Sequence, residues 1–295
     1  MMHSMEKDAN GAFWYKGNLH THTTRSDGRK TPEEVMELYK QKDYDFLSLT
    51  DHWVLSEEEE RDGLLMLPGC EYDVGGSAQE GIFHIVGVGM KETPPLVKGP
   101  ALTPQAIIDA VSGCGGLAVL AHPAWSLNRP ADALRLSGLA GTEIYNSVSG
   151  VPWNARPYSG AFVDQLALEG RLLPCFAADD AHFYNGDATR SYILVKAAEK
   201  TSAAILDAIR RRDFYATQGP RFSLAIQGDQ VEVTCSPVSS VVFFSDLVYA
   251  SDRVTAGEGI TRAVYRLKPG EHFLRVELQD AQGLCAWSSP ISLTD

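Results

Sequence analysis

Histidines and acidic residues form short clusters along the first two thirds of the sequence. The chain has eight histidines, and the six between residues 20 and 182 all lie in such clusters. They are His20, His22, His52, His84, His122 and His182. Imidazoles and carboxylates are common ligands of metal ions in proteins, so the clusters predict a metal site that holds more than one ion.

Spacing within the clusters favours chelation. His20 and His22 are two residues apart, as are Asp180 and His182. On an extended chain each pair points to one face and can hold one ion. Asp179 is the neighbouring alternative, but Asp180 shares a face with His182, so we assign the ligand to Asp180.

Two more carboxylates accompany the histidines. Asp27 lies in a turn after the first histidine pair, and Glu71 follows an apolar run and a Pro-Gly turn. A carboxylate can bridge two cations by giving one oxygen to each. Together with Asp180 these side chains bring three negative charges, so three divalent ions would leave about +3 and two would leave about +1. This balance favours a small anionic substrate, most naturally a phosphate ester.

The alternative reading is structural, because a single histidine on an apolar face is usually a hydrogen-bonded core residue. Six histidines with three acids are harder to explain in that way. Without an ion, several buried polar groups would need partners, at a cost of about 1–3 kcal/mol for each one left unsatisfied.

Apolar runs and capping signals alternate along residues 14–217. Strands are expected at 45–50, 82–88, 117–121, 142–145, 172–178 and 191–195. Helices are expected after Thr31, Thr103 and Thr201, which are good N-cap residues. This alternation predicts a parallel sheet, open or closed into a barrel. The histidine clusters follow these runs, except His84, which lies inside one; strand ends are where such folds place their ligands.

The pattern changes after Gly219-Pro220, where period-two apolar alternation without helices predicts a small all-β sandwich. We therefore expect a disordered or loosely held N-terminus over residues 1–13. The metal-dependent domain should cover residues 14–220, and the β-sandwich domain residues 221–295.

Composition excludes several classes of protein. The formal charge of −12 disfavours stable binding to duplex nucleic acid. No apolar run is long enough to span a bilayer, and the opening segment lacks the apolar middle of a secretory signal, so we expect a cytoplasmic protein without a membrane partner. Five scattered cysteines fit reduced thiols; a Cys235–Cys285 bridge is the alternative.

The order of the motifs resembles the PHP (polymerase and histidinol phosphatase) superfamily over roughly residues 14–217. The matching motifs are His20-Thr21-His22, Ser26-Asp27-Gly28, Thr50-Asp51-His52, Ala121-His122-Pro123 and Asp180-Ala181-His182. The resemblance implies a distorted (β/α)7 TIM-like barrel with phosphoesterase activity and two or three divalent ions of Zn, Mn or Fe. A barrel followed by a β domain also resembles stand-alone bacterial members.

By position, the resemblance implies three ligand sets. They are His20, His22, Glu71 and Asp180; Glu71, His84 and His122; and Asp27, His52 and His182. Some members carry histidine where this chain has Asp27, and the harder oxygen ligand favours Mn or Fe over Zn, or a weaker third ion.

Other polar residues receive smaller roles. Arg25 and Arg190 could grip a phosphate through their planar guanidinium groups, and Asn146 could line the cleft at a strand end. Asp51 should point away from its histidine neighbour and act structurally. The acidic run 57–60 predicts a solvated helix start.

We expect a metal-dependent phosphoesterase that hydrolyses a small phosphate mono- or diester through a metal-activated hydroxide. Glu71, Asp180 and His182 are the residues expected to take part in catalysis. One alternative is an amidohydrolase acting on C–N bonds, because such enzymes also begin with a His-x-His pair. Another is a metal- or ligand-binding module without catalysis. The oligomeric state is left open.

Overall fold

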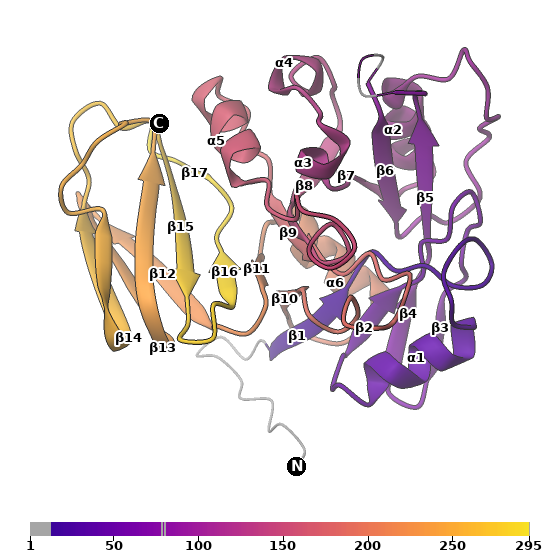
Figure 1. Cartoon of the computed structure of the whole chain (residues 1–295), viewed down its shortest axis with the longest axis horizontal. Coiled ribbons are helices and arrows are strands. Elements are labelled where there is room, and N and C mark those ends of the chain that lie inside the picture. Colours follow the sequence, from indigo (N-terminus) through magenta and orange to yellow (C-terminus); the bar gives the residue numbers. More distant parts are fainter. Residues whose placement is uncertain (1–12, 78, 80, 295) are drawn as a thin grey trace.

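The computed structural model describes residues 13–77, 79 and 81–294. The predicted loose N-terminus lies outside this range apart from Phe13. The described chain is a mixed α/β fold rich in strands, arranged as a five-stranded and a twelve-stranded sheet (Figure 1). None of the described helices is long and apolar enough to cross a membrane.

The five-stranded sheet carries most of the histidine clusters. Its strands, in spatial order, are β5 (Gly69–Val74), β6 (Phe83–Val88), β7 (Leu117–Leu120), β8 (Leu139–Asn146) and β9 (Cys175–Ala178). Neighbours β5, β6 and β7 run antiparallel, whereas β7, β8 and β9 are parallel.

The twelve-stranded sheet spans both halves of the chain. Its main path is β12-β13-β15-β16-β11-β10-β1-β2-β4-β3, with β14 paired to β13 and β17 to β15. The N-terminal members are β1 (Phe13–Asn18), β2 (Phe46–Ser48), β3 (Glu59–Arg61), β4 (Leu64–Leu67), β10 (Tyr192–Ala197) and β11 (Phe214–Thr217). The later members are β12 (Phe222–Gln227), β13 (Gln230–Ser245), β14 (Val254–Arg266), β15 (Phe273–Gln279), β16 (Cys285–Trp287) and β17 (Ile291–Ser292).

The expected (β/α)7 barrel is not formed as a closed barrel. In the described part of the chain the two sheets approach each other at isolated bridges, Thr21 with Ala181 and His52 with Glu71. The antiparallel strands β5 and β6 form a hairpin that needs no helical crossover, whereas the helix at Pro104–Gly113 lies between β6 and β7. The sheet that contains β1 also continues outward through β10 and β11.

The described helices are α1 (Pro32–Lys40), α2 (Pro104–Gly113), α3 (Pro123–Ser126), α4 (Pro130–Ala133), α5 (Gly160–Leu168) and α6 (Ser202–Arg210). Helices α1, α2 and α6 begin where the sequence predicts them, whereas α3, α4 and α5 were not expected. Thr31 forms a complete capping box with Glu34, and Thr103 and Thr201 also cap their helices. The helix start expected at 57–60 is wrong: this segment leads into the exposed edge strand β3, which pairs with β4.

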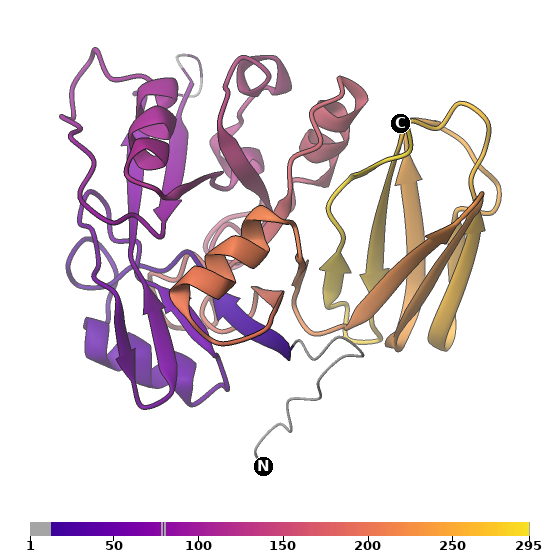
Figure 2. The same ribbon diagram turned by 180° about the vertical axis from the view of Figure 1, so that it is seen from behind.

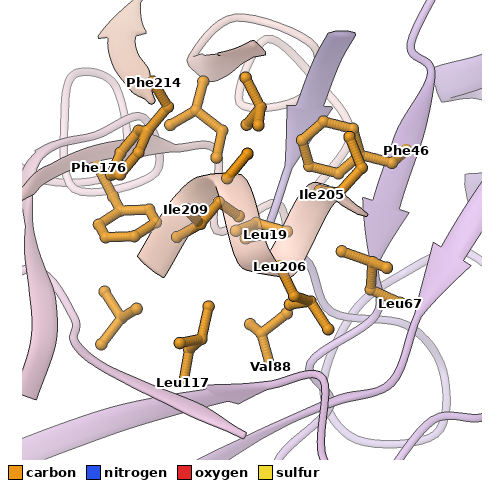
Figure 3. Close-up of a cluster of buried hydrophobic side chains, with 14 of the residues drawn as sticks. Leu19, Phe46, Leu67, Val88, Leu117, Phe176, Ile205, Leu206, Ile209 and Phe214 are labelled. Carbon is orange, nitrogen blue, oxygen red and sulfur yellow. The ribbon is translucent and has the colours of Figure 1, made fainter. Parts of the chain in front are cut away.

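Helix α6 holds the two sheets together through a shared apolar core. It is the orange helix in Figure 2. Ile205, Leu206 and Ile209 of this helix belong to a buried cluster with Phe176 of β9 and Phe214 of β11. Figure 3 shows these side chains meeting between the ribbons. Burial of such side chains contributes about 1.5–3 kcal/mol each, so this contact fixes the sheets that carry the clusters.

The C-terminal part is all-β, as expected, with a buried cluster of its own. It is not separated by hydrogen bonding from the rest, because β16 pairs with β11. The fully buried Arg275 also forms a two-point ion pair with Asp164 of α5, at 2.8 and 2.9 Å. The domain boundary near residue 220 stays a prediction. Cys235 and Cys285 are free thiols, so the alternative bridge is not formed.

Candidate metal centre

Four buried side chains meet at the end of β1. His20 and His22 follow this strand on an extended segment, and their Nε2 atoms lie 3.2 Å apart. Glu71 Oε2 is 3.2 Å from the first of these atoms and 2.9 Å from the second. Asp180 Oδ1 is 3.1 and 3.2 Å from the same two atoms. One oxygen from each carboxylate therefore joins two ring nitrogens in a compact group.

The spacing of these four atoms fits a tetrahedral ion. Ligands at the corners of a tetrahedron with bonds of about 2.0 Å lie about 3.3 Å apart. Five of the six distances between these atoms run from 2.9 to 3.2 Å. Asp180 Oδ1 is also buried with no hydrogen-bond partner among the described residues. A buried carboxylate oxygen without a donor is rare and calls for an ion or a water, so the donor set fits a divalent cation.

The second oxygen of Glu71 faces another pair of histidines. His84 Nδ1 lies 2.8 Å from Glu71 Oε1, and His122 Nε2 lies 3.4 Å from it. His52 approaches the first oxygen, with Nδ1 at 3.4 Å from Oε2, and this Nδ1 is a second buried atom without a partner among the described residues. Glu71 thus presents one oxygen to each of two histidine groups, as a bridging carboxylate does.

A third group lies toward the surface. Asp27 Oδ1 is 3.4 Å from His182 Nε2 and from His22 Nδ1, and Asp27 Oδ2 is 3.8 Å from His52 Nε2. Asp27 is 55% exposed, in contrast to the buried Glu71 and Asp180. All nine predicted ligands therefore lie close together. The group around His20 is buried, whereas the group around Asp27 is open to solvent.

Glu143 belongs to the centre, although it was not among the ligands expected from sequence. Its Oε1 lies 2.7 Å from His20 Nδ1, the ring nitrogen opposite the one that faces the cluster. Its Oε2 accepts the backbone N–H of His122 and the side-chain amide of Asn146, both at 2.8 Å. The signal available in the sequence is a carboxylate inside the largely buried strand β8. Glu143 fixes the orientation of one candidate ligand and the backbone of another.

Asn146 contributes to this arrangement rather than to an open wall of the cleft. Its amide donates to Glu143 and, at 3.2 Å, to Asp180 Oδ2. Its carbonyl accepts the backbone N–H and the hydroxyl of Ser149. Because the side chain is buried and its amide is fully engaged, it has no polar atom left for a substrate.

Two acidic neighbours of the candidate ligands hold loops. Asp51 accepts the backbone N–H and hydroxyl of Thr23, both at 2.7 Å, and the hydroxyl of Ser26 at 2.8 Å. This closes the loop that carries Asp27. Asp179 accepts the Tyr39 hydroxyl and three backbone N–H groups from residues 189–191, and burial raises the pKa of its carboxyl group to about 6.

The backbone is strained at two candidate ligands. Asp180 has a φ of 53° and His122 a φ of 28°, both in the left-handed region that L-residues avoid. The surrounding bonds hold these conformations: Asp180 N–H donates to His20 O at 2.8 Å, and Glu143 binds the backbone of His122. Strain of this kind is concentrated at functional sites.

Burial and charge compete at three groups of the centre, His20, Glu71 and His52. Burial lowers the pKa of His20, but the carboxylates of Asp180, Glu71 and Glu143 outweigh it and hold the pKa well above its usual value. Burial would raise the pKa of Glu71, but the histidines around it hold that pKa well below the usual range. Burial dominates at His52 and lowers its pKa. Imidazoles that share protons with carboxylates in this way release them when a cation binds.

The two arginines expected near a substrate lie on the surface. Arg190 donates from Nη1 to Gly186 O at 3.1 Å, and its backbone N–H binds Asp179. Arg25 is exposed, on the loop that carries Asp27. Trp125, which the sequence did not single out, packs edge-on against His122 and His84 with ring centroids 4.9 and 5.9 Å apart.

Comparisons with known proteins give partial answers. A family model described as a protein of unknown function (DUF3604) matches residues 158–236. No curated protein matches the chain. Among solved structures, a two-domain protein from Bacteroides vulgatus, containing a predicted PHP-like metal-dependent phosphoesterase, is 17% identical with a TM-score of 0.57. The alignment covers 98% of this chain and 99% of that one.

Two other solved structures are similar over part of the chain. One is a protein from Bifidobacterium adolescentis named as a metal-dependent phosphoesterase, with 14% identity, a TM-score of 0.43, and 60% and 89% of the two chains covered. The other is an amidohydrolase from Chromobacterium violaceum with bound sulfate and no metal, with 18% identity, a TM-score of 0.42, and 58% and 89% covered. The likeness to the Bacteroides protein shows that this chain shares its fold.

Proposed function

We propose that the protein is a metal-dependent phosphoesterase of the PHP type that hydrolyses a small phosphate mono- or diester. The observation that carries the proposal is the bridging position of Glu71, whose two oxygens face separate histidine groups at 2.8–3.4 Å. Two cations held by one carboxylate are the arrangement that phosphoryl transfer uses.

The candidate ligands divide into three sets, as the resemblance implies. His20, His22, Asp180 and Glu71 Oε2 would hold one divalent ion, and His84, His122 and Glu71 Oε1 a second. Asp27, His52 and His182 would hold a third. Bound ions of this kind neutralise phosphoryl oxygens and lower the pKa of water toward 7. Zn, Mn and Fe all suit this mixture of imidazole and carboxylate ligands.

The open side of the centre indicates where a substrate enters. His52, His84 and His182 keep 25, 16 and 19% of their side chains exposed, whereas His20 and His22 are buried. A phosphate group would reach the centre from these three histidines. With Glu143 included, four carboxylates face the site, so three divalent ions would leave a charge of about +2 and two would leave none. A site holding three ions would therefore attract an anionic substrate more strongly.

The test uses Glu71→Gln in the full-length chain, with p-nitrophenyl phosphate and a cyclic amide as parallel substrates. We expect phosphate release by the wild type and a loss of about 100-fold or more in the variant, on the scale of lost electrostatic stabilisation. Glu169→Gln, the same change at an exposed position, is the matched control and should retain wild-type turnover. Cleavage of the amide alone, or unchanged phosphate release by Glu71→Gln with full metal content, would contradict the proposal.

A further inference from the structure

A polar surface cavity lies at the opposite ends of the strands that lead to the metal centre. It has a volume of about 630 Å³ and is bordered by Leu117, Leu139 and Pro174, at the starts of β7, β8 and β9. The candidate ligands His122 and Asp180 lie just beyond the other ends of β7 and β9, and Glu143 lies four residues along β8 from Leu139, or about 13 Å at 3.3 Å per residue. Strand β8 alone covers seven residue steps, or about 23 Å at 3.3 Å per residue. The cavity is therefore distinct from the metal centre.

Three arginines line this cavity: Arg171 after α5, and Arg210 and Arg212 at the end of α6. Arg171 Nη2 donates to Leu136 O at 3.1 Å, and Arg210 Nη2 donates to Gly115 O at 2.9 Å. Bonds to carbonyl oxygens fix a guanidinium group without neutralising its charge. None of the three arginines pairs with a carboxylate in the parts of the chain that the structure describes.

The intervening Arg211 shows the contrast. Its guanidinium pairs with Asp207 and, at 2.9 Å, with Asp213, and it does not line the cavity. At the end of α6, the ion-paired Arg211 therefore lies outside the cavity, whereas Arg210 and Arg212, which have no carboxylate partner among the described residues, line it. The C-terminal end of α6 contributes about half a negative charge, which three guanidinium charges exceed.

Arg212 also occupies a position where glycine would be easier. Its φ is 65°, in the left-handed region just past the end of α6. Glycine adopts this conformation at helix ends without the steric cost that a side chain brings. An arginine held there adds a third positive charge to the cavity.

From these observations we propose that the cavity binds a small phosphorylated organic anion. Guanidinium groups match phosphate oxygens through paired N–H donors. Leu117, Leu139 and Pro174 supply apolar walls for the organic part. The volume falls within the range of small-molecule sites. An otherwise acidic chain that concentrates three unpaired cations in one cavity attracts such an anion there by charge.

The test is calorimetric titration of the full-length chain with phenylphosphonate, which cannot be hydrolysed, and with inorganic phosphate for comparison. Both probes can also bind at the metal centre. All the variants keep that centre unchanged, so any difference between their titrations reports binding to the cavity. Arg210→Gln and Arg212→Gln remove charges inside the cavity. Arg211→Gln, from the same turn, removes one outside it and is the matched control.

We expect each cavity variant to weaken one binding event about tenfold or more, as loss of a charged hydrogen-bond partner does. The double variant should abolish that event, while Arg211→Gln stays within twofold of the wild type. Phenylphosphonate should bind this site more tightly than phosphate because of the apolar walls. Equal titrations for the double variant and Arg211→Gln would show that the cavity does not bind the anion. Tighter binding of phosphate than of phenylphosphonate would contradict the proposal that the ligand carries an organic part. If the double variant does not fold, the single variants decide. Because no turnover is measured, this outcome is independent of the Glu71→Gln assay.

Discussion

Replacing Glu143 by glutamine tests whether this carboxylate organises the metal centre. The change keeps the shape of the side chain but replaces one acceptor oxygen with an NH₂ group. Glu143 Oε2 accepts two donors, from His122 and Asn146, and Oε1 faces His20 Nδ1. When Nε2 of His20 binds an ion, Nδ1 carries the proton, so all three neighbours are donors. Either orientation of the glutamine amide therefore sets a donor against a donor.

The size of the effect follows from this mismatch. A buried donor left without an acceptor costs about 1–3 kcal/mol. Loss of a carboxylate that orients a ligating histidine typically weakens metal affinity by about 10–100-fold, which corresponds to about 1.4–2.8 kcal/mol of binding free energy. The two estimates agree in scale. We expect Glu143→Gln to bind divalent ions about 10–100-fold more weakly than the wild type.

Competition with a coloured chelator measures this affinity directly, and elemental analysis gives the metal content. Glu169→Gln again serves as the matched control, because it makes the same chemical change at an exposed site. The control should bind metal like the wild type. Wild-type metal affinity in Glu143→Gln would refute the view that this carboxylate orients His20. A similar loss in the control would trace the effect to charge alone.

Three other predictions follow from the structure. Stripping the metal with a chelator should lower the melting temperature by about 5 °C or more, because a ligand at a hundred times its Kd stabilises by about 2.7 kcal/mol; no change on scanning calorimetry would count against a folded-state metal site. Asp164→Ala leaves the buried charge of Arg275 with Glu277 as its remaining carboxylate partner among the described residues, and should cost about 3 kcal/mol in urea unfolding, whereas a loss below about 1 kcal/mol would show that the pair contributes little. Thr31→Ala removes the capping box of α1 and should cost about 1 kcal/mol in the same assay; unchanged stability would mean that tertiary packing alone holds the helix start.

Local signals in the sequence predicted three helix starts and the histidine and carboxylate clusters of the candidate site. Helix starts at Thr31, Thr103 and Thr201 follow from hydrogen bonds between residues three apart, so no tertiary information is needed. The chelating faces of His20 with His22 depend on the period of an extended chain. Residue type and spacing are enough to propose such features.

Contacts between distant segments could not be read in the same way. Glu143 meets His20 across 123 positions of sequence, and no local pattern records that pairing. The edge strand at 59–61 replaced an expected helix because β4 offered it a partner. The barrel is not closed: β5 and β6 form an antiparallel hairpin in one sheet, and in the other β11 pairs with β16 from the C-terminal part of the chain.

The sequence by itself determined which side chains could bind a cation and which short segments would carry them. Tertiary structure decided that these side chains share one carboxylate, which oxygen faces which ring, and that a set of arginines gathers at the other end of the same strands. The physical reason is that ligand chemistry belongs to individual residues. Distances of 3 Å between segments exist only after the core around α6 has packed the sheets together.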